Sequence, residues 1–172
     1  MRIRLTKQQL IYFIIMYISD LVITYFITKK MITDEINKLL GDDITNELII
    51  DIIAIIVIII AAIFLIAQAV IYKFMVKVIG EKRKFTLGVN LYLIMLSVLP
   101  GTIMMFVMVM IFDDITKQSN TWITYITSIM SALIYCILLL RFDLIAKKQM
   151  YILLSVLLFV NIVFSSLTFI YL

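Results

Sequence analysis

The sequence predicts an all-α protein whose five helices form a polytopic transmembrane bundle. Hydrophobic residues make up 65% of the 172-residue chain and charged residues only 15%, and the mean hydropathy is +1.17. A typical soluble domain is about 45–50% apolar and about 25% charged, so most of these side chains need lipid around them. The apolar residues gather in five segments, each long enough to cross a hydrocarbon core that takes about 20 helical residues.

The first predicted span covers about residues 10–28 and follows a short basic N-terminus. A signal peptide also starts basic and then apolar, but no small-residue cleavage site follows and the apolar run continues beyond Asp20, so we expect a retained helix. The second span has the strongest signal, because its apolar run from Ile52 to Ala67 is too long for a strand and shows no barrel alternation. The later spans are expected at about residues 48–76, 90–112, 121–140 and 151–172.

Charged residues between the spans predict the orientation of the bundle. We expect residues 29–47 to form an outer loop, with a short surface helix capped by Thr33 and ended by Gly41. Residues 77–89 are expected to form a basic inner loop. Eleven of the 15 Lys and Arg residues fall on one side of the bundle, and the positive-inside rule makes that side cytoplasmic. The prediction is one multi-pass plasma-membrane domain, residues 1–172, with its N-terminus cytoplasmic and its C-terminus outside.

The composition also argues against several classes of function. The net charge is +4, but the positive residues are spread over loops, which fits membrane orientation better than nucleic-acid binding. The chain has no histidine and a single cysteine, Cys136, which leaves no zinc site and no intramolecular disulfide. It has no nucleophile elbow, phosphate loop or paired membrane carboxylates. We therefore expect a protein that is not an enzyme and has no cofactor, metal or nucleic-acid partner.

Asp20 lies near the middle of the first span. An ionised carboxylate there costs at least about 2.5 kcal/mol on insertion scales, so it normally faces protein or water. Tyr17 and Thr24 lie three residues before it and four after it, which gives the helix a polar stripe. A proton or cation site and a hydrogen-bonded packing contact are both open. The packing contact is favoured, because no second intramembrane acid or base offers a relay.

The third and fourth spans carry predicted packing surfaces. Pro100 removes the hydrogen bond to the Leu96 carbonyl and predicts a kink, to which Gly101 adds freedom. Asn90, Ser97 and Gly101 fall on one face, which favours a packing surface over a gating hinge. Polar residues recur at helical spacing in the fourth span and predict an interhelical seam: Thr121, Thr124, Ser128, Ser131 and Tyr135.

Lys82, Arg83 and Lys84 concentrate positive charge in the predicted inner loop. They are candidates for contact with anionic lipid headgroups, where each Lys or Arg adds about 1 kcal/mol, or with an acidic partner. A third explanation is that these residues only fix the membrane topology, and we give it the same weight as the other two explanations combined.

Gly80 is followed by Phe85 and then by an apolar helix with a mid-span proline, Leu91–Pro100. Together with the five spans, this pattern resembles the Yip (Ypt/Rab-interacting protein) domain family of five-span integral membrane proteins. The resemblance implies a membrane adaptor or accessory protein, with Rab-linked trafficking in eukaryotic members and largely undefined roles in bacterial ones. The isoleucine- and lysine-rich composition suits a bacterial member.

Three functions remain open from the sequence. The favoured one is a non-enzymatic accessory or scaffold protein beside an export or envelope-stress system, with membrane lipids and a membrane protein as partners. The first alternative is a transport component in which Asp20 and the Pro100 kink line a path. The second is an immunity-type protein that protects against a membrane-active peptide.

Overall fold

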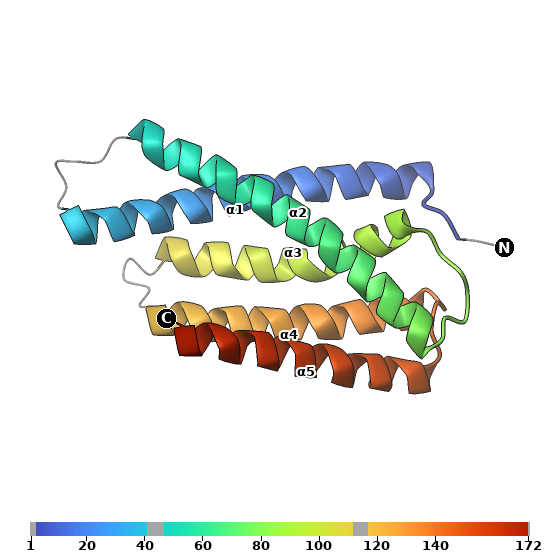
Figure 1. The fold of residues 1–172 in the computed structure, drawn as a ribbon. Coiled ribbons are helices and arrows are strands. Elements are labelled where there is room, and N and C mark those ends of the chain that lie inside the picture. Colours follow the sequence, from blue (N-terminus) through green and yellow to red (C-terminus); the bar gives the residue numbers. More distant parts are fainter. Residues whose placement is uncertain (1–2, 41–46, 112–116, 172) are drawn as a thin grey trace.

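Five α-helices build the part of the chain that the computed structural model describes, which is residues 3–40, 47–111 and 117–171 (Figure 1). The side-chain surroundings of residues 38–40, 117–121 and 162–171 lie outside this description. The all-α fold class predicted from the sequence is confirmed. The helices are α1 (Lys7–Leu40), α2 (Glu47–Ile79), α3 (Leu87–Ile111), α4 (Lys117–Arg141) and α5 (Lys147–Tyr171).

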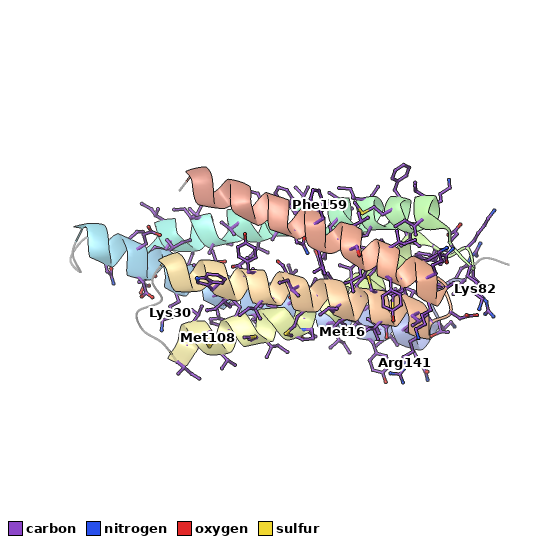
Figure 2. All side chains as sticks on the ribbon, turned by 90° about the horizontal axis from the view of Figure 1, so that it is seen from below. Met16, Lys30, Lys82, Met108, Arg141 and Phe159 are labelled. Atoms are coloured by element: carbon purple, nitrogen blue, oxygen red, sulfur yellow. The ribbon has the colours of Figure 1, made fainter. Side chains whose placement is uncertain are left out.

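Four of the helices lie side by side, and α2 crosses them diagonally (Figure 1). In the side-by-side set α1 packs on α3, α3 on α4 and α4 on α5, while α2 contacts α1, α3 and α5. Figure 2 places Lys82 and Arg141 toward one end of the bundle, and Lys30 and Met108 toward the other. We call the first the basic end and the second the opposite end. The helix α1 begins at the basic end, and α5 ends at the opposite end (Figure 1).

The outer surface of the bundle is apolar. Large side chains of α2 such as Ile63, Phe64 and Phe74 are at least 62% exposed, which lipid tolerates and water does not. Within the described residues, four helical stretches are long and apolar enough to cross a membrane. These stretches are Lys7–Asn37, Glu47–Ile79, Leu87–Ile111 and Trp122–Arg141.

The tightly packed core lies toward the basic end. Its buried side chains come from the second half of α2, the first half of α3, the second half of α4 and the first half of α5, and they include Val76, Leu93, Leu139 and Leu153. Leu144, from the loop between α4 and α5, is also fully buried. The basic end is therefore tightly packed, and two cavities lie farther along the helices.

Loops at the basic end are ordered by backbone hydrogen bonds. The Ile3 amide donates to the Lys84 carbonyl at 2.9 Å, and the Thr86 amide donates to the Ile3 carbonyl at 3.1 Å. Thr6 and Gln9 form a reciprocal capping box at the start of α1, with side-chain bonds of 2.9 and 3.2 Å. The N-terminal segment is thus fastened to the loop that follows α2.

The prediction of an outer loop at residues 29–47 is wrong for residues 29–40, because α1 continues to Leu40. Thr33 does not cap a new helix: its hydroxyl donates to the Lys29 carbonyl one turn back at 2.9 Å. No glycine or proline occurs before Gly41, so nothing in the backbone stops α1 where the charges begin. Gly41 itself lies outside the described residues.

The other helices also start earlier than the apolar runs that predicted them. The third, fourth and fifth begin at Leu87, Lys117 and Lys147 instead of at residues 90, 121 and 151. Thr86 supports the start of α3, because its hydroxyl accepts the Val89 amide at 3.4 Å. The predicted inner loop of residues 77–89 shrinks accordingly, since α2 runs to Ile79.

Candidate functional site: a polar cavity inside the bundle

Asp20 of α1 lines a cavity of about 280 Å³ between α1, α2 and α3. Tyr17 and Thr24 line it as well, so the polar stripe predicted from helical spacing faces the bundle and not the lipid. The opposite walls come from α2 and α3. They are formed by Ala61, Ala62, Phe64, Leu65, Gln68, Val98 and Thr102.

The carboxyl group of Asp20 is incompletely satisfied. It lies in hydrogen-bonding contact with the Thr102 side chain. Its Oδ1 atom is buried and has no hydrogen-bond partner among the residues that the structure describes. Leaving a buried acceptor unpaired costs about 1–3 kcal/mol, and more when it is charged. An oxygen in this position needs a donor that the described side chains do not supply, such as a proton, a water molecule or a bound ligand.

A second cavity of about 380 Å³ adjoins the first, and Thr24, Gln68, Val98 and Thr102 line both. It extends from α1 and α2 across α3 to α4, and it reaches Asn161 of α5. Between them the two cavities are lined by all five helices, and we refer to the pair as the central cavity. The remaining lining residues of this part are Ile27, Tyr72, Gly101, Met105, Thr124, Thr127, Ser128 and Ser131.

The chemistry of the central cavity is mixed. Hydroxyl and amide groups are interleaved with aliphatic and aromatic walls. Among the described residues that line it, Asp20 is the only Asp, Glu, Lys or Arg. An intramembrane acid in such a place is by default a candidate functional residue.

Gly101 lets α3 and α4 approach closely beside this cavity. A Cβ atom at Gly101 would lie 3.1 Å from the Cβ of Thr127, which is tighter than ordinary contact. One turn earlier the Ser97 and Ser131 hydroxyls lie 3.3 Å apart. Small and hydroxylic residues of this kind allow close packing of membrane helices. Ser128 lies on the same side of α4 and faces the cavity.

Pro100 is placed differently from its neighbour. It is exposed and does not line the central cavity, whereas Gly101 is buried and does. The alternative in which Pro100 itself lines a path therefore has no geometric support. The cavity wall at this level is made by Gly101 and Thr102.

Asn90 and Tyr135 form a buried hydrogen-bonded pair between α3 and α4. Asn90 is fully buried on α3, and its amide donates to the Ala69 carbonyl of α2 at 2.6 Å. Tyr135 of α4 donates its hydroxyl to the Asn90 amide oxygen at 2.6 Å. The Tyr135 ring also packs on the ring of Tyr72, 5.2 Å between centroids, and Tyr72 lines the cavity. This network joins α2, α3 and α4 next to the central cavity, because Tyr72 belongs to both.

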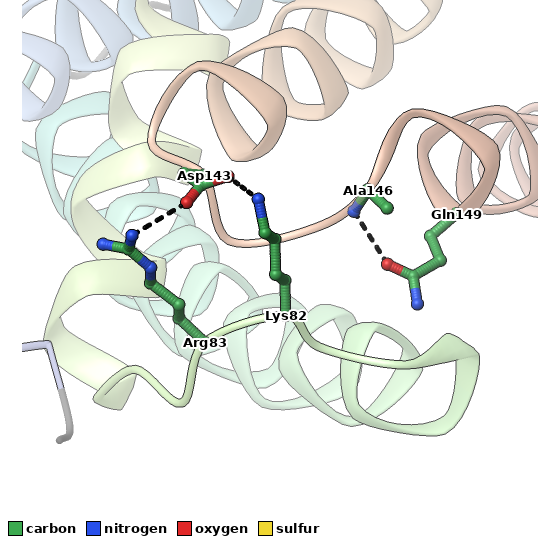
Figure 3. A network of polar contacts seen from close by, with 5 residues as sticks. All are labelled: Lys82, Arg83, Asp143, Ala146 and Gln149. Carbon is green, nitrogen blue, oxygen red and sulfur yellow. Dashed lines mark hydrogen bonds and ion pairs between the residues drawn. The ribbon is translucent and has the colours of Figure 1, made fainter.

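Lys82 and Arg83 are engaged with Asp143 of the α4–α5 loop (Figure 3). The Arg83 Nη2 atom lies 3.0 Å from Asp143 Oδ2, and Lys82 pairs with Oδ1. The hydrogen bond from Lys82 is the main reason why the pKa of Asp143 lies below its usual range. Lys84 is exposed. Two of the three predicted lipid or partner contacts thus have an acidic partner within the chain.

Sequence reasoning did not single out Gln68 or Thr102, although both line the two halves of the central cavity. Gln68 carried a usable signal, because it follows directly on the apolar run that ends at Ala67. An amide in the middle of a membrane helix normally faces protein. Thr102 had no comparable signal, since hydroxyl residues are common in membrane helices.

Fold and site together define a membrane-type helix bundle with a polar interior cavity and one acidic side chain in it. Comparison of the chain with known protein families, curated proteins and solved structures finds no match. The resemblance to the Yip family therefore stays a prediction, and function is inferred from the geometry of the chain itself.

Proposed function

We propose that this protein is a five-span plasma-membrane protein that binds a small ligand in the central cavity and serves, without enzymatic chemistry, as a component of membrane transport. The observation that carries the proposal is the Asp20 Oδ1 atom, which is buried and lacks a hydrogen-bond partner among the described residues. It borders the cavity between α1, α2 and α3, and residues of α4 and α5 line the adjoining one. An ionisable side chain inside a membrane helix costs free energy, and such residues commonly mark a functional site.

The proposed topology places the basic end in the cytoplasm. Eleven of the 15 basic residues support this orientation, and an odd number of helices puts the N-terminus inside and the C-terminus outside. Cysteine substitution at Lys84, in a Cys136→Ala background, tests it. A membrane-impermeant maleimide is expected to label this residue only after the cells are opened. Labelling in intact cells would reverse the orientation.

Transport is tested with the purified full-length chain in proteoliposomes. A panel of labelled cationic, neutral and anionic solutes is followed for wild type and for Asp20→Asn. At least one solute is expected to cross faster with wild type than with empty vesicles, and to lose this advantage with Asp20→Asn. The matched control is Asp51→Asn. Asp51 does not line the cavity, and its carboxylate pairs with Lys29 at 2.7 Å. If no solute in the panel crosses or binds, the proposal fails.

A second candidate is the accessory role that the Yip resemblance implies. The observation that favours it is the ordered loop at the basic end, where Phe85 is buried to 1% exposure and accepts a hydrogen bond from Lys73 Nζ at 2.7 Å. A rigid exposed loop that displays Lys84 is a suitable docking surface. Purification in mild detergent is expected to recover a defined membrane partner with wild type and to lose it with Lys84→Glu. A partner bound equally by both would remove this loop from the interaction.

A further inference from the structure

We infer that the ligand of the central cavity is an amphipathic organic monocation, that is, an ammonium head on an apolar body. The inference rests on the proposed function and narrows it to one chemical class. Four features of the cavity lead to it: its charge, its volume, its walls and its access from the lipid.

The charge balance of the cavity calls for a cation. Asp20 contributes the carboxyl group, and no Lys or Arg is among the described lining residues. Two basic side chains farther along α1 and α2 already have partners. Lys29 pairs with Asp51 at 2.7 Å, and Lys73 donates to the Phe85 carbonyl at 2.7 Å. When Asp20 is ionised, its counter-charge must therefore come from a ligand; without a ligand, a proton neutralises the carboxyl group.

The volume of the cavity favours an organic cation over a metal ion. The part that Asp20 lines measures about 280 Å³ and the adjoining part about 380 Å³, which is close to the lower end of the range of about 300–1,000 Å³ typical of small-molecule sites. A divalent metal needs several carboxylate, imidazole or thiolate ligands. No group of three such side chains converges anywhere in the described part of the chain.

The walls of the cavity suit an amphipathic molecule. Tyr17, Phe64 and Tyr72 supply aromatic rings, which attract organic cations through their π faces. Thr24 and Thr102 line the same cavity as Asp20, and their hydroxyl oxygens can accept hydrogen bonds from an ammonium head. Aliphatic side chains complete the enclosure for an apolar body: Leu21, Ile27, Leu65, Val98 and Met105.

The cavity also reaches the lipid-facing surface. Phe64 lines it and is nevertheless 70% exposed on the outside of α2. A ligand that partitions into the bilayer can therefore enter from the side between α1 and α2. This route fits a molecule with an apolar body and does not suit a hydrated inorganic ion, whose desolvation in lipid is expensive.

The test uses benzyltrimethylammonium and its uncharged isostere neopentylbenzene, with the full-length protein in nanodiscs of zwitterionic lipid. Equilibrium dialysis measures binding to wild type, Asp20→Asn and Asp51→Asn. We expect wild type and Asp51→Asn to bind the ammonium at least about tenfold more tightly than Asp20→Asn. The isostere is expected to bind all three equally. Because the ammonium is quaternary, it has no proton to transfer to the carboxylate and keeps its positive charge.

A cavity-filling variant, Ala62→Phe, keeps the test decisive if Asp20→Asn fails to fold. Ala62 lines the cavity beside Asp20, and a phenyl ring there is expected to abolish ammonium binding with the carboxylate intact. Equal ammonium binding by wild type and by a folded Asp20→Asn or Ala62→Phe would overturn the inference. If a neutral or anionic solute binds through Asp20 instead, the transport proposal stands and the cation inference falls. If no solute of any charge binds, both fall.

Discussion

The hydroxyl of Tyr135 donates a 2.6 Å hydrogen bond to the amide oxygen of Asn90, and both side chains are fully buried. The Asn90 amide passes the link on to the Ala69 carbonyl at 2.6 Å. One pair of residues therefore joins three helices next to the central cavity. Polar groups in lipid have few other partners, which makes this contact a specific lock between the helices.

Tyr135→Phe is expected to lower the free energy of unfolding by about 1 kcal/mol, because it leaves the Asn90 oxygen unpaired. Asn90→Ala should cost more, since it removes the partner of both Tyr135 and Ala69. Unfolding in mixed micelles with increasing SDS measures both. Tyr151→Phe is the control: Tyr151 is 55% exposed, and its change should be negligible. Equal effects at the two tyrosines would contradict the role given to Asn90.

Gly101→Ala is expected to weaken α3–α4 packing, because the new methyl group would meet the Thr127 Cβ at 3.1 Å. The cost should be about 1–3 kcal/mol, as for other overpacked sites. Gly88→Ala in the same helix is the control. Its Cβ would meet nothing closer than Leu5 Cδ1 at 3.5 Å, so it should be neutral or stabilising. A stable Gly101→Ala variant would show that α3 and α4 separate easily.

Gly80→Ala is expected to destabilise the basic end by more than about 1 kcal/mol. Gly80 has a φ of +114°, and a Cβ there would lie 2.6 Å from Gln149 Nε2. Gln149 is held in place by the Ala146 amide, which donates to its Oε1 at 2.7 Å (Figure 3). Adding Gln149→Ala should relieve the clash but not the backbone strain, so thermal unfolding should recover only in part. Full recovery would assign the whole cost to the clash.

The ion pairs of Asp143 predict a loss of stability in acid. Its pKa is lowered mainly by the hydrogen bond from Lys82, so the folded state holds the carboxyl proton more weakly than the unfolded chain. The contribution is therefore fully present above the ordinary aspartate pKa of 3.8 and is lost as the pH falls through the lower folded value. Thermal unfolding from about pH 7 to about pH 3 is expected to show a smaller acid-dependent loss in Asp143→Asn than in wild type.

The backbone conformation of Asp143 predicts different stabilities for its replacement by alanine and by asparagine. Asp143 has a φ of 56°, a left-handed conformation that asparagine tolerates better than alanine. Asp143→Ala should therefore be less stable than Asp143→Asn at neutral pH, where both lack the ion pairs. Identical unfolding temperatures would mean that the loop rearranges freely.

Helix number followed from the sequence, but helix ends did not. The charge pattern assigns Lys29, Lys117 and Lys147 to loops, and all three are helical. Charge shows where a helix leaves the hydrocarbon, whereas a helix ends where the backbone can no longer continue. With no glycine or proline before Gly41, α1 had no reason to end at the first lysine.

The candidate site was predictable only along single helices. Periodicity placed Tyr17, Asp20 and Thr24 on one face, because that relation lies within α1. It did not place Gln68 opposite them, since the diagonal crossing of α2 is set by packing between helices. Nor did it reveal that Lys82 pairs with Asp143, a residue 61 positions away.

The compact core at the basic end draws on both extremities of the chain. Ile3 and Leu5 pack against it from the N-terminal segment, and Leu153 and Leu157 of α5 belong to it. During synthesis, a chain that contains only the first four helices therefore lacks one side of this core. The hydrogen bonds of Asn90 need only α2, α3 and α4, whereas the apolar core is completed by Leu153 and Leu157 of α5. Loss of α5 should consequently destabilise the basic end even though the hydrogen bonds of Asn90 remain in place.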